Sequence, residues 1–216
     1  SKSASGCSAF IALNCTIKGV TFFVFATASG FWRLTFANIT MRKRLNAELQ
    51  RLQPADYSQA ERPTIWVILE NLRSAHNVGS LFRTCDAFGM SGISLCGYCA
   101  RPPHKQVDKV ALGAQLSLPW DGHENALSAI QAAKDKGLLV LAVEQADEAI
   151  QLQDLPSPQG GIALVFGNEV DGVSELAMAA CDGAVEIPQF GSKHSLNVSV
   201  CGGAVLWEVA RRYRKL

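Results

Sequence analysis

Three polar segments of the chain carry residues that could do chemistry, and each of them directly follows a short apolar run. The first covers residues 70–84 and holds Asn77, Gly79 and Arg83. A glycine permits another chain or a ligand to approach closely, and an arginine one helical turn later could bind a phosphate group. The alternative is an ordinary helix with Asn77 as its N-cap and Arg83 in solvent, and the spacing alone favours neither interpretation.

The second segment, Gly167-Asn-Glu-Val-Asp-Gly172, places two carboxylates between two glycines. Its spacing matches neither the dinucleotide-binding glycine pattern nor a phosphate-binding loop, and it holds no lysine. Glu169 and Asp171 could bind magnesium, but two acids without a further ligand are weak support for a metal. Such a loop suits a ligand with hydroxyls or an amine. The alternative is a tight turn in which one of the two acids caps the next helix.

The third segment, Ile187-Pro-Gln-Phe-Gly-Ser-Lys-His-Ser-Leu-Asn-Val-Ser199, leads into an expected helix that contains the adjacent glycines Gly202 and Gly203. A glycine inside a helix costs about 1 kcal/mol relative to alanine, so the pair indicates close packing against the same chain or against a partner subunit. Ligands of parallel sheets bind beyond the carboxyl ends of the strands. Three polar segments at such ends therefore predict a single cleft.

The elements that position these segments alternate regularly after residue 64. Short runs rich in β-branched residues are typical of buried parallel strands, and segments with helical periodicity separate them. The expected strands are 65–69, 93–96, 138–143, 162–166 and 184–187. The expected helices are 78–88, 107–113, 124–136, 174–180 and 195–213. This alternation predicts an α/β fold with a parallel sheet.

The composition fits a globular protein with one sizeable domain. The chain has 216 residues, of which 48% are hydrophobic, and its formal net charge is +1, so any basic surface for a polyanion must be local. Its seven cysteines include one CxxC pair, Cys96 and Cys99, which we expect at the end of a buried strand rather than in a redox or metal site. Scattered thiols of odd number are typical of a reduced, cytoplasmic protein.

The first forty residues differ from the rest of the chain. They contain Lys2, Lys18 and Arg33 but no acidic residue, and we expect residues 1–40 to form an extension outside the domain, which would begin near Met41. Their longest uncharged apolar run is too short to span a bilayer. We expect no membrane role, although an anchor at a membrane surface is the alternative.

A basic segment, residues 41–63, separates this extension from the expected domain, residues 64–216. Leu45, Leu49 and Leu52 recur there at helical spacing, which predicts a short amphipathic helix. Such a helix would either pack on the domain with a solvated outer face or contact a polyanion.

Taken together, the three polar segments resemble the three motifs of the SpoU-type (TrmH-like) RNA 2′-O-ribose methyltransferases of the SPOUT superfamily. The first match runs from Asn77 to Gly89, the second from Leu164 to Gly172 and the third from Ile187 to Ser199. They stand in the family's order and at its separations. The resemblance implies a parallel-sheet SPOUT fold with a deep C-terminal trefoil knot, S-adenosylmethionine as cofactor, no metal, and a homodimer with sites near the interface.

The resemblance also implies which residues form the site. The positions that match the family's polar active-site residues are Asn77, Arg83, Glu169, Ser195 and Asn197. The positions that would line the pocket for S-adenosylmethionine, largely through backbone groups, are Phe166, Gly167, Asn168, Ile187, Pro188, Leu196, Asn197 and Ser199.

Arg83 holds the position of the family's proposed catalytic residue, and its chemistry leaves two roles open. A free arginine has a pKa above about 12 and stays protonated. In the first role a substrate phosphate perturbs Arg83, which then takes the proton of the 2′-hydroxyl. In the second, Arg83 stabilises the developing alkoxide and orients the phosphate, and the proton leaves by another route. Ser195 and Asn197 would hold the target nucleotide, and Glu169 would orient these groups.

An RNA substrate requires a local basic surface on a nearly neutral chain. The residues expected to contact RNA are Arg42, Lys43, Arg44, Arg101, Lys105 and Lys109. We expect a tRNA substrate, since the sequence shows no large N-terminal recognition domain of the sort that some rRNA-modifying relatives carry. The alternatives are an rRNA substrate, or a knotted RNA-binding protein without activity. A Rossmann-type enzyme is disfavoured because the glycine fingerprint and its acidic partner are absent.

Overall fold

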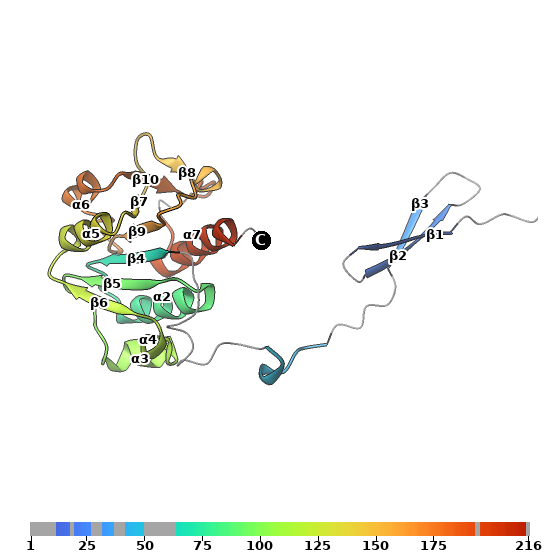
Figure 1. Ribbon diagram of the computed structural model, residues 1–216, viewed down its shortest axis with the longest axis horizontal. Coiled ribbons are helices and arrows are strands. Elements are labelled where there is room, and N and C mark those ends of the chain that lie inside the picture. The colour runs from blue at the N-terminus through green and yellow to red at the C-terminus, as the bar shows by residue number, and fades with distance from the viewer. Residues whose placement is uncertain are drawn as a thin grey trace, which may run out of the picture. The chain divides into compact units, whose positions relative to one another are not determined.

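The computed structural model describes residues 12–17, 20–26, 32–36, 42–49, 64–192 and 195–214 (Figure 1). The chain divides into two compact units, residues 1–51 and residues 52–216. The first unit holds an antiparallel sheet in the order β1-β2-β3, made of β1 (Ala12–Ile17), β2 (Val20–Ala26) and β3 (Trp32–Phe36). The sequence analysis predicted no strands in this part of the chain, although its content of Val, Thr and Phe favours them.

The amphipathic helix expected over residues 41–63 is not present in the part that the structure describes. Residues 42–49 contain a single 3₁₀ turn, η1 (Asn46–Leu49), and Leu45 is 67% exposed. Leu52 lies outside the described residues. Arg42 forms an ion pair with Glu48 at 3.1 Å. Local charge pairing rather than an apolar helical face therefore organises this turn.

The second unit is built on a seven-stranded sheet in the order β6-β5-β4-β9-β7-β10-β8, and all of its strand pairs are parallel (Figure 1). The strands are β4 (Ile65–Glu70), β5 (Gly92–Cys96), β6 (Trp120–His123), β7 (Leu139–Val143), β8 (Ile150–Gln151), β9 (Ile162–Phe166) and β10 (Gly183–Glu186). The predicted α/β fold with a parallel sheet is confirmed. All five predicted strands are present, whereas the edge strands β6 and β8 were missed because they are short and only partly buried.

Helices cover both faces of this sheet. They are α2 (Ala75–Phe88), α3 (Lys105–Ala111), α4 (Ala114–Ser117), α5 (Ala126–Asp135), α6 (Glu175–Ala180) and α7 (Val198–Tyr213), with a 3₁₀ turn η2 (Leu152–Asp154). Figure 1 shows α2 and α7 on one side and α5 and α6 on the other. The core divides accordingly: Val67 and Leu69 pack with α2 and α7, while Ile68 packs with α5, as the period of two along a strand requires.

The two adjacent glycines of α7 have different surroundings. A Cβ on Gly202 would lie 2.4 Å from Leu81 Cδ2 and 3.8 Å from Phe166 Cε1, whereas a Cβ on Gly203 would meet no described atom within 4 Å. Gly202 therefore lets α7 approach α2 within the same chain, whereas the space beside Gly203 is open in the single chain. No described helix is both long and apolar enough to cross a membrane.

Candidate functional site

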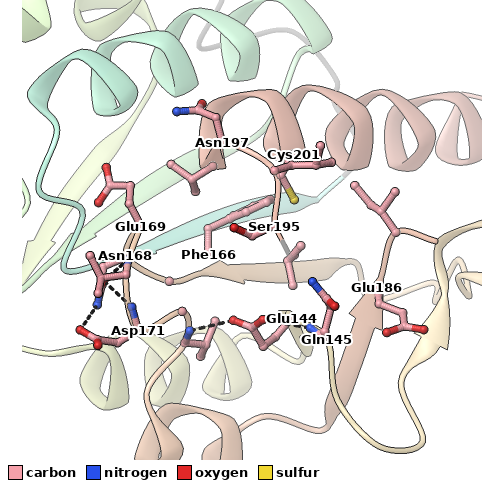
Figure 2. A pocket seen from close by; sticks show the side chains of 18 of the residues that line it. Glu144, Gln145, Phe166, Asn168, Glu169, Asp171, Glu186, Ser195, Asn197 and Cys201 are labelled. Carbon is pink, nitrogen blue, oxygen red and sulfur yellow. Dashed lines mark hydrogen bonds between the residues drawn. The ribbon is translucent and has the colours of Figure 1, made fainter. Parts of the chain in front are cut away.

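The carboxyl ends of β7, β9 and β10 surround a cavity of about 450 Å³ (Figure 2). Four stretches of chain line it: Val143–Gln145, Phe166–Val173, Val185–Ile187 with Gln189, and Ser195–Val198 with Cys201. In Figure 2, Glu169 and Asn197 lie on one side of the cavity, and Glu144 and Gln145 lie on the other. The second and third polar segments thus meet in one cleft, as predicted.

The loop after β9 is a closed turn held by its own hydrogen bonds. The backbone groups of Asn168 and Gly172 bond to each other in both directions at 3.1 Å. The Asn168 side-chain oxygen accepts hydrogen bonds from the N–H groups of Val170 (2.8 Å) and Asp171 (2.9 Å). A Cβ on Gly167 would lie 1.9 Å from the carbonyl carbon of Gly172. The first glycine of the motif is therefore required to close the turn.

Glu169 connects this turn to the first polar segment. Its carboxylate accepts hydrogen bonds from the backbone N–H groups of Arg73 (3.0 Å) and Ser74 (3.2 Å) and from Asn77 Nδ2 (2.8 Å). Burial by itself would raise the pKa of Glu169, but the hydrogen bonds from Arg73, Asn77 and Ser74 outweigh burial and lower it. The group is therefore ionised at neutral pH, and its charge stands at the N-terminus of α2, where an anion is favourable.

The interpretation of Asn77 as an N-cap was wrong. Ser74 caps α2 by accepting the N–H of Asn77 at 3.3 Å. Asn77 lies inside the first turn, is only 7% exposed, and uses its side chain to bind Glu169. Likewise neither Glu169 nor Asp171 caps the helix after the second segment, because Ser174 does so by accepting the N–H of Ala177. The asparagine was misassigned because its side chain has a tertiary partner that local sequence does not indicate.

Asn197 joins the third segment to the same group of side chains. Its side-chain oxygen accepts from Ser199 N at 2.9 Å and so caps α7, which begins at Val198 and not at residue 195 as predicted. Its Nδ2 donates to Asn77 Oδ1 at 3.4 Å. A chain of hydrogen bonds thus runs from Glu169 through Asn77 to Asn197 and connects all three polar segments at the edge of the cavity.

A fourth polar segment, which the sequence analysis missed, follows β7. One Glu144 oxygen accepts the N–H of Val173 at 3.1 Å, and the other accepts the N–H of Gln145 at 3.0 Å. A Cβ on Gly172 would lie 2.2 Å from Glu144 Oε2, so Glu144 packs directly on the turn after β9. The signal was present in the sequence, since Glu144 and Gln145 follow the predicted strand 138–143 in the same way that the other segments follow theirs.

The predicted site residues fall into three groups. Those that line the cavity are Phe166, Gly167, Asn168, Glu169, Ile187, Ser195, Leu196 and Asn197. Asn77 does not line the cavity but forms hydrogen bonds with two residues that do, Glu169 and Asn197. Pro188, Ser199 and Arg83 do not line the cavity. The lining residues that were not predicted include Gln189 and Cys201, and burial raises the pKa of the Cys201 thiol to about 11, so this thiol is protonated at neutral pH.

Arg83 is exposed on α2, and its side chain makes no hydrogen bond or ion pair with any residue that the structure describes. Gly79, one turn earlier, packs directly against α3, because a Cβ there would lie 2.7 Å from the carbonyl oxygen of Val107. The glycine that suggested a ligand contact therefore serves helix packing. Arg83 remains free to meet a substrate that comes from solvent.

The residues predicted to contact RNA lie in different settings. Arg101 donates hydrogen bonds to the carbonyl oxygens of Leu95 (3.3 Å) and His123 (2.6 Å), which hold it at the ends of β5 and β6. Lys105 and Lys109 are exposed on α3. The other three, Arg42, Lys43 and Arg44, are exposed in the first unit of the chain.

The CxxC pair has the structural role that was expected. Cys96 ends β5, and both Cys96 and Cys99 are buried. Cys99 Sγ accepts the N–H of Leu72 at 3.1 Å and donates to the carbonyl of Leu69 at 3.3 Å. Burial raises the pKa of Cys96 to about 12, which disfavours the thiolate that redox chemistry requires.

The chemistry of the cavity fits S-adenosylmethionine. Its volume suits a small organic ligand, and its apolar wall, which includes Phe166, Ile187 and Leu196, suits a flat heterocycle. Glu144, Glu169 and Glu186 provide carboxylates for hydroxyls or a cation. Among the residues that the structure describes, no lysine or arginine lines the cavity. Within residues 64–192 and 195–214, no group of three His, Cys, Asp or Glu side chains is arranged to hold a metal ion.

Comparison with known proteins is consistent with this geometry. The model of the SpoU rRNA Methylase family matches residues 64–207. A tRNA (guanosine(18)-2′-O)-methyltransferase of Thermus thermophilus is 32% identical over 184 residues, which cover 81% of this chain and 88% of the relative. A 23S rRNA (guanosine-2′-O-)-methyltransferase of Neisseria meningitidis is 33% identical over 150 residues, which cover 69% of this chain but only 59% of the relative.

Solved structures share the fold. An AdoMet-bound rRNA methyltransferase from Sinorhizobium meliloti has a TM-score of 0.65 and 27% identity, and the match covers 76% of this chain and 62% of that one. The SpoU methyltransferase AviRb from Streptomyces viridochromogenes, in complex with AdoMet, has a TM-score of 0.62 and 26% identity, and the match covers 74% of this chain and 61% of that one.

Proposed function

Because the chain belongs to the SpoU rRNA methylase family, we propose that residues 64–214 catalyse the 2′-O-methylation of a ribose in RNA. S-adenosylmethionine is the methyl donor, and it supplies an electrophilic methyl group on a sulfonium when bound. The observation that carries the proposal is the hydrogen-bonded chain Glu169–Asn77–Asn197 at the edge of the cavity. It joins three segments that are far apart in sequence around a pocket of suitable size and chemistry.

We propose that Phe166, Gly167, Ile187 and Leu196 hold the cofactor, and that polar side chains at the cavity edge hold the target nucleotide. The ionised Glu169 fixes the Asn77 amide, and the Asn77 oxygen in turn orients Asn197. The Ser195 hydroxyl and the Asn197 amide would then position the 2′-hydroxyl for attack. Such positioning accounts for much of the rate enhancement available without a metal.

For Arg83 we propose a contact that forms only with bound RNA. Its side chain has no described partner and is exposed, so a substrate phosphate is the natural counter-charge. Both roles stay in the proposal: Arg83 could take the hydroxyl proton only as a neutral guanidine that has first lost its own proton, whereas the protonated guanidinium would stabilise the alkoxide. Lys105 and Lys109, together with Arg101 and the basic residues Arg42, Lys43 and Arg44, would contact the RNA backbone.

We propose tRNA as the substrate in preference to rRNA. The supporting observation is that the match spans 88% of the Thermus tRNA methyltransferase, but about three fifths of the length of the relatives that act on 23S rRNA. We also propose a cytoplasmic location, with which such a substrate agrees.

We also propose a homodimer and a C-terminal knot. The outer face of α7 exposes Val200 and Trp207, and a Cβ on Gly203 between them would meet no described atom within 4 Å. A second copy of the chain would cover these apolar side chains. The knot is supported by the path of the chain. The last helix of the domain, α7, follows β10 in the chain and packs on α2, an element from the start of the domain, beside Leu81. We propose that the C-terminal part of the chain threads a loop of the preceding chain and forms a deep trefoil knot.

The test is transfer of tritiated methyl groups from S-adenosylmethionine to purified tRNA and, separately, to rRNA. We expect incorporation into tRNA, a loss of about a hundredfold or more in Arg83→Ala, and an unchanged cofactor Kd by calorimetry. Arg83→Lys is the matched control, because it keeps the positive charge but removes the planar guanidinium with its paired hydrogen-bond donors. Absence of cofactor binding would refute the proposal. If the protein binds cofactor and RNA but transfers no methyl group to tRNA or to rRNA, it is a non-catalytic RNA-binding protein instead.

A further inference from the structure

The turns that follow β4 and β5 are bound to each other beside the cavity. The Asn71 N–H donates to the Cys96 carbonyl at 3.3 Å, and the Asn71 side-chain oxygen accepts the N–H of Tyr98 at 3.3 Å. Asn71 and Gly97 both have left-handed backbone conformations, with φ of 54° and 63°. A Cβ on Gly97 would lie 1.9 Å from the Asn71 oxygen, so the contact between the turns requires a glycine.

The same two turns are attached to the wall of the cavity and to the sheet. The Arg73 N–H donates to Glu169 at 3.0 Å, and Glu169 lines the cavity. The Gly97 N–H donates to the carbonyl of His123, the last residue of β6, at 3.1 Å. The backbone of both turns is therefore held in place beside the site.

These fixed turns present an aromatic ring and a guanidinium to solvent. Tyr98 is 57% exposed, and the side chain of Arg73 is exposed as well. The two residues lie on adjoining turns, because the side chain of Asn71, two positions before Arg73, accepts the N–H of Tyr98. The nearby Tyr98 side chain is also the main cause of the raised pKa of Arg73. Burial in the core does not account for the tyrosine, because most of its surface remains in water. An exposed ring on a rigid turn is suited to contact with a ligand.

The charges near Arg73 determine which part of an RNA fits here. The carboxylates of Asp171 and Glu169 are close enough to contribute to the raised pKa of Arg73. They offset the charge of the guanidinium and would repel a phosphate. A nucleobase is uncharged, and its face stacks well on tyrosine and arginine side chains. The surface therefore suits a base better than it suits the RNA backbone.

We propose that Tyr98 and Arg73 form a nucleobase-binding subsite, in which the ring of Tyr98 stacks on a base of the substrate RNA at or next to the methylated nucleotide. Arg73 holds the edge of that base through its guanidinium. The inference rests on the proposed function, because it takes the target ribose to lie at the edge of the cavity beside Glu169. The subsite would place this ribose by stacking on the base.

The first experiment measures the Kd for an unmodified tRNA transcript that the protein methylates. We expect Tyr98→Ala to raise this Kd about tenfold, and Tyr98→Phe, which keeps the ring, to stay within about twofold of the wild-type value. Leu176→Ala, which truncates an exposed side chain on α6, is the control and should have no effect. Arg73→Ala should weaken RNA binding while the backbone contact to Glu169 is retained. The cofactor Kd, measured by calorimetry, should be unchanged in every variant.

The second experiment identifies the base. After the methylated position has been mapped by mass spectrometry, transcripts with an abasic site at that position or at either neighbour are compared on the wild type and on Tyr98→Ala. One abasic site should weaken binding to the wild type and have little further effect on the variant. Equal RNA affinity of Tyr98→Ala and wild type would overturn the inference, and so would a defect of Tyr98→Phe as large as that of Tyr98→Ala. If the wild type itself transfers no methyl group, the proposed function itself is wrong.

Discussion

Asn77 Nδ2 lies 2.8 Å from a carboxylate oxygen of Glu169, although the two residues are 92 positions apart in the chain. The contact joins the first turn of α2 to the loop after β9. Both strands that precede these segments, β4 and β9, are neighbours in the sheet, and this pairing brings the two residues together. The relationship has consequences for stability and for activity that can be measured separately.

Glu169→Gln should lower stability in a way that depends on pH. The folded-state pKa of Glu169 lies below its ordinary value of 4.5, so the charged form contributes stability that is present above the unfolded pKa and is lost as pH falls through the folded pKa. We expect the variant to be about 1 kcal/mol less stable at pH 7. Urea unfolding at pH 7, 5 and 3 should show this difference shrinking with acidity. A difference that is constant with pH would contradict the assignment.

Asn197 offers a matched pair of substitutions that separates capping from orientation. Asn197→Asp keeps an oxygen that accepts the N–H of Ser199 but loses the donor to Asn77, whereas Asn197→Ala loses both. We expect Asn197→Ala to cost about 1 kcal/mol of stability and Asn197→Asp to cost little. Methyl transfer should fall in both variants, by up to about a hundredfold. Wild-type activity in Asn197→Asp would show that the bond to Asn77 does not orient the site.

Glu144 should affect cofactor binding through the turn on which it packs. Glu144→Ala removes the acceptor for the N–H of Val173, and we expect the Kd for S-adenosylmethionine to rise about five- to tenfold. Glu144→Gln keeps an acceptor and should have a smaller effect. Asp147→Ala, an exposed residue of the same loop, is the control. Calorimetry with the cofactor alone makes the comparison without RNA.

Gly202→Ala and Gly203→Ala test the two faces of α7. The first substitution places a methyl group against Leu81 and should cost about 1–3 kcal/mol of stability. The second enters open space in a single chain, so helix propensity should raise stability by up to about 1 kcal/mol. Urea unfolding of both variants, with sedimentation velocity to monitor assembly, makes the comparison. A destabilised Gly203→Ala that also dissociates would show that a partner subunit covers this face.

Trp207→Glu tests the proposed homodimer directly. Trp207 is 48% exposed in the single chain and is close to Phe88, with ring centroids 5.6 Å apart. A charge at this position should disrupt a subunit interface, since an unpaired buried charge is strongly unfavourable, and should leave the fold of the chain intact. We expect the sedimentation coefficient of the wild type to be that of a dimer and that of the variant to be that of a monomer. A monomeric wild type would refute the proposal.

The class of fold and the three polar segments could be predicted from local patterns along the chain. The runs from Ile65 and from Ile162 are apolar and short, and buried parallel strands have this pattern because both of their faces pack against helices. The motifs that resemble those of the SpoU family lie within residues 64–207, which the family model also matches. Local composition carries this information because strand burial and glycine-dependent turns depend on residues close together in the chain.

The contacts between these segments, in contrast, depend on the fold of the whole domain. Asn77 has the local appearance of a helix cap, yet its partner is Glu169, and that partner is set by the pairing of β4 with β9. Glu144 is part of the site because β7, which precedes it, pairs with β9 on the edge opposite to β4. The periodicity of the sequence does not indicate this strand order. Gly202 and Gly203 are adjacent glycines, but a Cβ on the first would meet Leu81, whereas a Cβ on the second would enter open space. Contacts between strands and helices that are distant in sequence depend on the order of the sheet, and so the arrangement of the site is a property of the folded chain.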